Sequence, residues 1–165
     1  RYSAIRERIE SKPDTLHPVT RAIITPAAER SAVECFEAQY RLQALKRAAD
    51  AVLAEVDCII TPTAPTIFRI DEEQQEPVRL NSLLGTYTNF MNLLDYAAVA
   101  VPAGFSARGL PYGVTLFGPA FSDDALLAYA SRLHLALGTP VGTSARLPAP
   151  PMPRAVNDQL ELVVC

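Results

Sequence analysis

The side chains that most often perform chemistry are few in this sequence and lie far apart. The two histidines, His17 and His134, have no cysteine or carboxylate at the spacing of a metal site. Lys12 and Lys46 are the only lysines, and each lies in charged, helical surroundings that predict a solvated ammonium group. No serine has the strand–turn–helix context of a nucleophile elbow, and no glycine-rich run matches a phosphate-binding loop. The residues alone therefore predict no self-sufficient catalytic site.

Two stretches are more specific than composition requires. The first is Thr61-Pro62-Thr63-Ala64-Pro65, which follows the apolar run 58–60 and predicts a rigid loop after a buried strand. The second begins with the letters AVPAGF at 100–105 and continues with GLPYGVTLFGP at 109–119 and DDALL at 123–127. It predicts buried strands over 97–101 and 113–117, followed by a helix that Ser122 opens and Gly138 ends.

The N-terminal part is predicted to be helical and contains no glycine before Gly85. Two short helices are expected over 1–10 and 19–24. Ser31 with Glu34 predicts a capping box at the start of a longer helix that reaches about Val56. Apolar residues recur there at spacings of three and four, so we expect this face to lie on a core. Its members are Cys35, Ala38, Leu42, Leu45, Ala49, Val52 and Val56.

The remaining segments complete an α/β pattern, in which helices alternate with short buried strands. The charged segment 71–76 is predicted to be a solvated loop, and 81–94 a turn with a short helix. Residues 148–153 contain four prolines and predict a stiff linker. The apolar residues at 160–164 predict the first strand of a further domain.

Composition bounds the class of protein. The chain has 165 residues, 49% of them hydrophobic and 20% charged, with a net charge of −3, so we expect a folded domain rather than a disordered, membrane-spanning or nucleic-acid-binding chain. Three widely spaced cysteines indicate reduced thiols and a cytoplasmic location. The start at Arg1 has neither an initiator methionine nor an apolar leader, and we expect the chain to come from the interior of a longer protein.

Taken in order, the two stretches resemble the C-terminal part of amidase signature enzymes. The resemblance covers about residues 1–145 and implies an α/β fold with a mixed sheet covered by helices, incomplete on its own. Residues 146–159 would then form a proline-rich linker, and 160–165 the start of a further C-terminal domain. We expect the missing part of such a domain to cover sheet residues Ile59, Ile60, Val99 and Val101.

Within this family the sequence resembles the allophanate hydrolases in particular. The likeness implies hydrolysis of allophanate to ammonia and carbon dioxide in urea breakdown, with no cofactor or metal. It also implies a small-molecule substrate, a homodimer formed through the complete amidase domain, and association with urea carboxylase. The segments that carry the likeness are 16–21, 31–33, 40–42, 61–67 and 79–82.

The resemblance assigns no catalytic residue to this chain. Amidase signature enzymes use a Ser–cis-Ser–Lys triad, in which one serine attacks the carbonyl and the lysine acts as the base. That triad lies upstream of the segments matched here, and neither Lys12 nor Lys46 has the context of its lysine. The chain is therefore predicted to be inactive alone.

One substrate-binding residue is implied. Counting back from the Leu16-His17-Pro18 segment, the arginine that holds the substrate carboxylate in allophanate hydrolases falls on Arg1, which could equally be an exposed terminal arginine. Tyr87 and Asn89 are weaker candidates for lining the pocket, because both could instead cap or pack a short helix. Two alternatives remain: another amidase, general or the amidotransferase subunit that amidates Glu-tRNA, and a non-catalytic α/β binding module.

Overall fold

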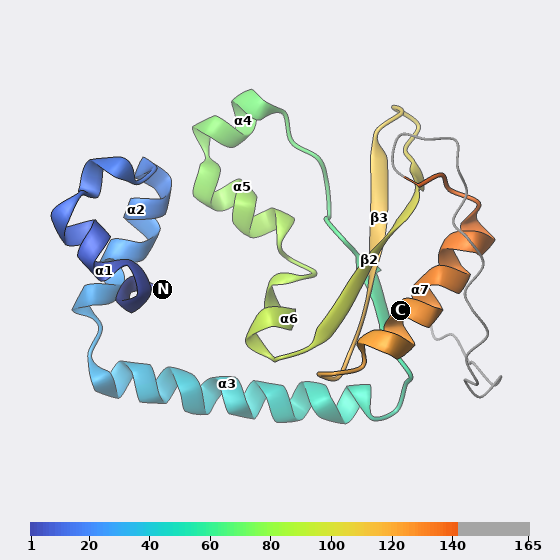
Figure 1. The fold of residues 1–165 in the computed structure, drawn as a ribbon, viewed down its shortest axis with the longest axis horizontal. Helices are drawn as coiled ribbons and strands as arrows, with labels where there is room; N and C mark the ends of the chain where they lie inside the picture. The colour runs from blue at the N-terminus through green and yellow to red at the C-terminus, as the bar shows by residue number, and fades with distance from the viewer. Residues whose placement is uncertain (142–165) are drawn as a thin grey trace.

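The computed structural model describes residues 1–141, which form a helical unit and a sheet unit joined by one long helix (Figure 1). The helical unit contains α1 (Tyr2–Ser11), α2 (Pro18–Ile24) and the two 3-10 turns η1 (Pro13–Thr15) and η2 (Thr25–Glu29). Both helices agree with the prediction, and Ile9 of α1 is their buried apolar residue. The predicted linker 146–159 and the strand at 160–164 lie outside the described residues.

The long helix α3 (Ala32–Leu53) begins at the predicted capping box. The Glu34 amide donates to Ser31 Oγ at 3.1 Å, and the Ser31 amide donates to the Glu34 carboxylate at 2.8 Å. This pair satisfies two amides that would otherwise lack partners at the helix start. The helix ends three residues before Val56, so its predicted extent is confirmed to within one turn.

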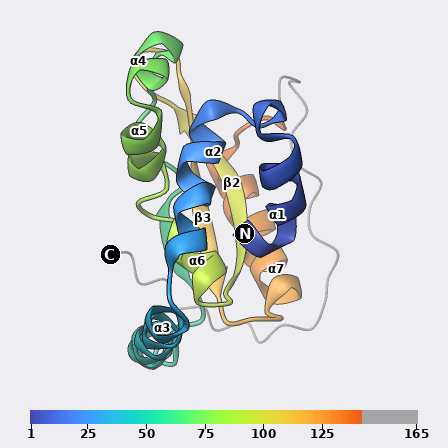
Figure 2. The same cartoon turned by 90° about the vertical axis from the view of Figure 1, so that its left-hand side faces the viewer.

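The prediction that the apolar face of α3 lies on a core is wrong for much of its length. Leu45 and Val52 are 56% and 58% exposed, and only Leu53 of this helix is buried. The reason is the position of the helix, which runs from the helical unit to the sheet unit (Figure 1; seen end-on in Figure 2) and packs on the sheet unit through Leu53 at its C-terminal end. Periodicity identifies an apolar face but not whether another part of the chain reaches it.

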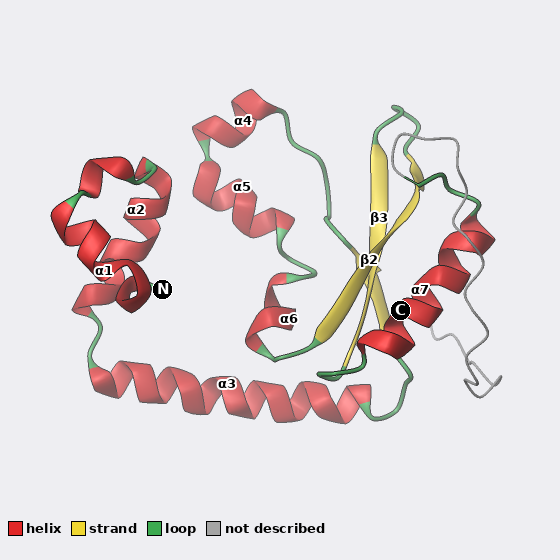
Figure 3. Cartoon of the chain, in the orientation of Figure 1, coloured by secondary structure: helices red, strands yellow, loops and turns green. Residues whose placement is uncertain are grey.

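The sheet has three strands, β1 (Ile59–Pro62), β2 (Ala97–Phe105) and β3 (Pro111–Gly118), in the order β1-β3-β2. Both ladders of the described sheet are antiparallel, with Ile60 opposite Leu116 and Val99 opposite Leu116 on the other side. The predicted strands are therefore present, and β2 and β3 are longer than expected. Figure 3 shows this sheet flanked by helices, which confirms the α/β class.

Helix α7 (Asp123–Leu137) covers one face of the sheet, and its Leu126 and Ala130 pack on Val101 and Leu116. Ile60 and Val99 are partly buried against the same cluster. The expectation that the missing part of the domain covers these residues is therefore wrong for Val101, which α7 buries, whereas Ile60 and Val99 are covered only in part. Gly138 ends α7 with φ of 63°, as predicted.

The opposite face carries a second cluster, in which Leu53, Met91 and Phe117 are buried. Phe90 meets Phe117 edge-on with 5.3 Å between ring centres, and Ile59 packs against this cluster. The same cover was expected for Ile59, which, like Ile60, is covered only in part. The second cluster joins α3 and α6 (Asn89–Leu93) to the sheet.

The segment between β1 and β2 is more helical than predicted. It forms α4 (Ile70–Gln75), α5 (Pro77–Leu84) and α6, so the loop predicted at 71–76 is wrong. The Arg69 amide donates to the Glu72 carboxylate at 2.9 Å, and three acidic residues lie in the first turn of α4, where the helix dipole favours them.

Ser122 was predicted to open α7 as its cap, but its hydroxyl donates to the Pro119 carbonyl instead. No described helix is long and apolar enough to cross a membrane.

Tyr96 and Asp50 fasten α3 to the sheet unit. The Tyr96 hydroxyl donates to Asp50 at 2.8 Å, Lys46 pairs with the same carboxylate at 3.0 Å, and its ammonium lies 4.7 Å from the Tyr96 ring centre. The hydrogen bonds from Lys46 and Tyr96 lower the pKa of Asp50. Burial, with the hydrogen bond to Asp50, raises the pKa of Tyr96 to about 12.

We predict that Tyr96→Phe destabilises the chain and that this loss shrinks at alkaline pH. The folded state holds the phenol proton more tightly than the unfolded chain, so this stabilisation is complete below the ordinary pKa of 10.0 and disappears as pH rises toward about 12. Urea unfolding of both proteins at about pH 8 and about pH 11 measures it. Tyr40→Phe, at a tyrosine that is 70% exposed, is the control. It should leave the free energy of unfolding unchanged at both pH values. A pH-independent difference would contradict the assignment.

Candidate functional site

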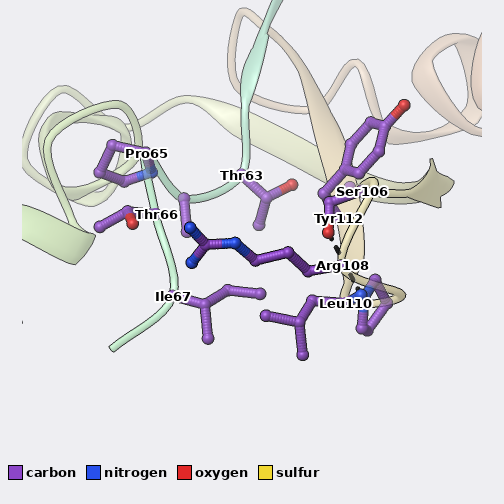
Figure 4. Close-up of a pocket in the computed structure, with 11 residues that line it drawn as sticks. Thr63, Pro65, Thr66, Ile67, Ser106, Arg108, Leu110 and Tyr112 are labelled. Atoms are coloured by element: carbon purple, nitrogen blue, oxygen red, sulfur yellow. Dashed lines mark hydrogen bonds between the residues drawn. The ribbon is translucent and has the colours of Figure 1, made fainter. Parts of the chain in front are cut away.

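A cavity of about 390 Å³ opens where β1 ends (Figure 4). One wall is the proline–threonine loop at 63–67, and the other is the β2–β3 hairpin at 106–113. The cavity lies beyond the carboxyl end of β1, between the loop that follows β1 and the turn that joins β2 to β3. It is the candidate site of the described chain.

The proline–threonine loop is held in place by β3. The Thr63 amide donates to the Gly113 carbonyl at 3.0 Å, and the hydroxyls of Thr63 and Thr115 lie 2.8 Å apart. Thr115 is only 4% exposed, so this hydroxyl pair lies mostly out of water. This hydrogen bond to the buried Thr115 gives the loop one preferred position.

Gly113 allows the close approach that forms this corner. A Cβ at this position would lie 2.9 Å from the Val101 carbonyl oxygen and 3.3 Å from Thr63 Oγ1. Any side chain there would push β3 away from β2 or from the loop. The glycine of the sequence motif is therefore required by packing.

The hairpin turn that forms the other wall is also fixed. Ser106 and Leu110 exchange hydrogen bonds, with the Ser106 amide donating to the Leu110 carbonyl at 2.8 Å and the Leu110 amide donating to Ser106 Oγ at 3.2 Å. Gly109 adopts a φ of 76°, which glycine reaches without strain. Arg108 projects from this turn toward the proline–threonine loop (Figure 4).

The lining combines an apolar surface with a few polar groups. Ile67, Leu110 and two prolines supply the apolar part, and Thr66 and Tyr112 add hydroxyls. Arg108 is the only charged residue that the described chain contributes. Among residues 1–141, no aspartate, glutamate, histidine or lysine lines this cavity, so this part of the chain gives it no general base. The described residues therefore contribute ligand contacts to this cavity.

The residues selected from the sequence do not meet at this cavity. Arg1 precedes α1 in the helical unit, exposed and across from the sheet (Figure 1). Tyr87 is 39% exposed, and Asn89 packs over Gly85 at the start of α6; neither lines the cavity. Lys46 is engaged by Asp50 and Tyr96 and has a structural role.

Sequence reasoning missed Arg108 and Thr115. Arg108 stands just before the Gly109-Leu110-Pro111 turn, and a turn that faces a rigid proline–threonine loop was a usable signal. Thr115 was predicted only as one residue of a buried strand. A hydroxyl in such an apolar run must find a partner, and this requirement could have singled it out.

The sequence profile of the family described as Amidase matches residues 5–127. This chain belongs to the amidase family. It is 45% identical over 134 residues to the urea amidolyase of Saccharomyces cerevisiae, a match that covers 80% of this chain and 7% of that protein. A solved structure of Kluyveromyces lactis allophanate hydrolase, a Ser-to-Ala variant, is similar with a TM-score of 0.75 and 41% identity. That match covers 81% of this chain and 22% of the other.

Other members of the amidase family match over shorter stretches. A glutamyl-tRNA(Gln) amidotransferase subunit of Treponema denticola is 34% identical over 99 residues, or 59% of this chain and 20% of that protein. The chain thus spans less than a quarter of the length of each of these relatives. The matched residues 5–127 include most of the helical unit, α3 and the whole sheet with its hairpin, all of which the structure describes.

We predict that Thr115→Val costs about 1–3 kcal/mol of unfolding free energy, because it leaves the Thr63 hydroxyl without its partner. The double variant Thr63→Val/Thr115→Val should recover part of that loss, since no hydroxyl then lacks a partner. Urea unfolding of the single and double variants measures the coupling. Thr20→Val on exposed α2 is the control. Strictly additive losses would show that the hydroxyl pair does not hold the loop.

Proposed function

We propose that this chain forms the C-terminal part of the amidase domain of an allophanate hydrolase. The observation that supports this most directly is its 45% identity to a urea amidolyase across 134 residues, together with the fold shared with an allophanate hydrolase. The proposed reaction is hydrolysis of the amide of allophanate, in which water replaces the nitrogen and ammonia leaves. The nucleophile and base of that reaction would come from outside this chain.

In this proposal the chain supplies structure and substrate contacts. The proline–threonine loop, held by β3, forms one wall of the cavity at the end of β1, where the reacting amide would be held. The fixed hydroxyl pair of Thr63 and Thr115 supports that wall. A rigid wall favours catalysis because it holds reactants near the catalytic groups without a cost in ordering.

We further propose that Arg1 binds the carboxylate of allophanate. A guanidinium presents two parallel N–H donors to a carboxylate, which a lysine cannot do. Arg1 is exposed at the start of α1, so its approach to the substrate would depend on parts of an amidase domain beyond the described residues.

The partners follow the same reasoning and are proposals as well. The substrate would be a small molecule, and a homodimer would form through the complete amidase domain. Association with a urea carboxylase is supported by the likeness to a urea amidolyase, of whose length this chain matches only 7%. A cytoplasmic location accords with the cysteines, of which Cys35 and Cys58 are free thiols.

A second candidate is an amidotransferase component, favoured by the 34% identity to the Treponema denticola protein. A non-catalytic binding module is a third, favoured by a cavity to whose lining the described residues contribute no base. Substrate preference distinguishes the first two, and any amide hydrolysis by a reconstituted enzyme eliminates the third.

We predict that a chimera restores allophanate hydrolysis while the chain alone does not. Residues 1–141 would replace the matching segment of Kluyveromyces lactis allophanate hydrolase with its catalytic serine intact, and ammonia release from allophanate would be measured. The isolated 165-residue chain should release no more ammonia than buffer. A folded chimera that hydrolyses glutamine but not allophanate would favour the amidotransferase, and activity of the isolated chain would overturn the assignment.

Arg1→Lys in the same chimera should lower kcat/KM for allophanate by about tenfold or more, because the charge remains but the planar fork is lost. Biuret, a neutral amide, should be affected much less. Arg6→Lys is the matched control, since Arg6 lies in α1, the helix that follows Arg1, and pairs with Glu10 at 2.8 Å. Equal losses on both substrates would make Arg1 a structural residue.

A further inference from the structure

We propose that the cavity between the proline–threonine loop and the β2–β3 hairpin binds a small carboxylate with an apolar body, and that Arg108 is the residue that binds the carboxylate. The inference concerns the cavity whose loop wall the proposed function places beside the reacting amide, but its test measures binding and needs no turnover. Three observations support it: the walls of the cavity are held by hydrogen bonds, Arg108 has no partner among residues 1–141, and the other lining residues are largely apolar.

Both walls are formed before any ligand binds. The loop wall is held by the Thr63 amide on Gly113 and by the Thr63–Thr115 hydroxyl pair. The hairpin wall is held by the hydrogen bonds between Ser106 and Leu110. A ligand that enters therefore has little backbone to order, which removes one of the main costs of binding.

Arg108 is available to a ligand. It makes no hydrogen bond or ion pair with any other residue in the range 1–141, whereas Arg6, Arg30, Arg69 and Arg79 each pair with a carboxylate of their own segment. Its guanidinium extends across the cavity toward Thr66 (Figure 4). No acidic residue of the described chain lines the cavity, so the positive charge there is not balanced by these surroundings.

The lining also indicates the class of ligand. A guanidinium matches the planar geometry of a carboxylate, and the Thr66 hydroxyl offers a further donor beside it. Ile67, Leu110 and Pro111 provide an apolar surface for the rest of the molecule. A volume of about 390 Å³ lies within the range of small-molecule sites and accommodates a compact organic acid.

Benzoate and its neutral analogue benzamide are probes that separate the charge from the apolar body. We expect benzoate to shift the backbone amide signals of Thr66, Ile67, Gly109 and Leu110 in NMR spectra of the full 165-residue chain, and benzamide to bind at least about tenfold more weakly. Arg108→Gln should reduce the affinity for benzoate to that for benzamide. Arg108→Lys should give an affinity for benzoate between those of the unchanged chain and Arg108→Gln.

Arg69→Gln is the matched control, because Arg69 is an exposed arginine near the same loop but pairs with Asp71 at 2.9 Å. It should leave benzoate binding unchanged. Unchanged binding in Arg108→Gln, equal affinity for the two probes, or shifts confined to other parts of the chain would each overturn the proposal. The same titration in the chimera serves if the isolated chain does not remain folded at the concentrations needed.

Competition distinguishes two sources of the carboxylate. If allophanate displaces benzoate, the site accepts the substrate of the proposed reaction. If it does not, the site takes a different organic acid and is separate from the reacting amide. Because the binding measurement needs no turnover, an inactive chimera with intact benzoate binding would reject the proposed function and leave this site standing.

Discussion

The inner position of β3 is the constraint on which the sheet unit depends. Its backbone pairs with β1 on one side and β2 on the other, and Thr115, Leu116, Phe117 and Gly118 are all buried. Successive side chains of a strand point to opposite faces. Leu116 therefore enters the cluster under α7, while Phe117 enters the cluster that holds α3 and α6.

The same strand connects this packing with the cavity. The register that opposes Thr61 to Thr115 brings the end of β1 beside the start of β3, so the loop that follows β1 must lie against the hairpin. The cavity is thus a product of strand pairing. Its two walls belong to segments more than thirty residues apart, and no local property of either segment creates it.

Sequence patterns predicted the features that depend on neighbouring residues. The capping box of Ser31 and Glu34, the end of α7 at Gly138 and the three strands are examples, since each rests on local hydrogen bonding or on a short apolar run. The sequence also indicated the proline–threonine loop and the two strands that the hairpin of the candidate site connects. Their likeness to amidase signature enzymes indicated the family.

Features that depend on distant contacts could not be predicted in the same way. The face of α3 was identified, yet Leu45 and Val52 remain exposed because the sheet unit reaches only part of that helix. The charged segment of α4 looked like a loop, because its stability comes from charges at the helix start rather than from burial. Arg108 could not be identified as a lining residue from the sequence, because the loop that faces it lies about forty residues earlier in the chain.

Helix α3 has a mechanical consequence for the arrangement of the two units. Its 22 residues form a continuous rod of about 33 Å that sets the spacing between the helical unit and the sheet. Each residue of a helix advances the chain by about 1.5 Å and turns it by about 100°. Loss of one residue from this rod would hardly shorten it but would swing the helical unit, with Arg1, to a different side of the sheet. Insertions or deletions in α3 are therefore tolerated only in steps that approximate whole turns. This exposed helix thus fixes both the distance and the relative orientation of the two units.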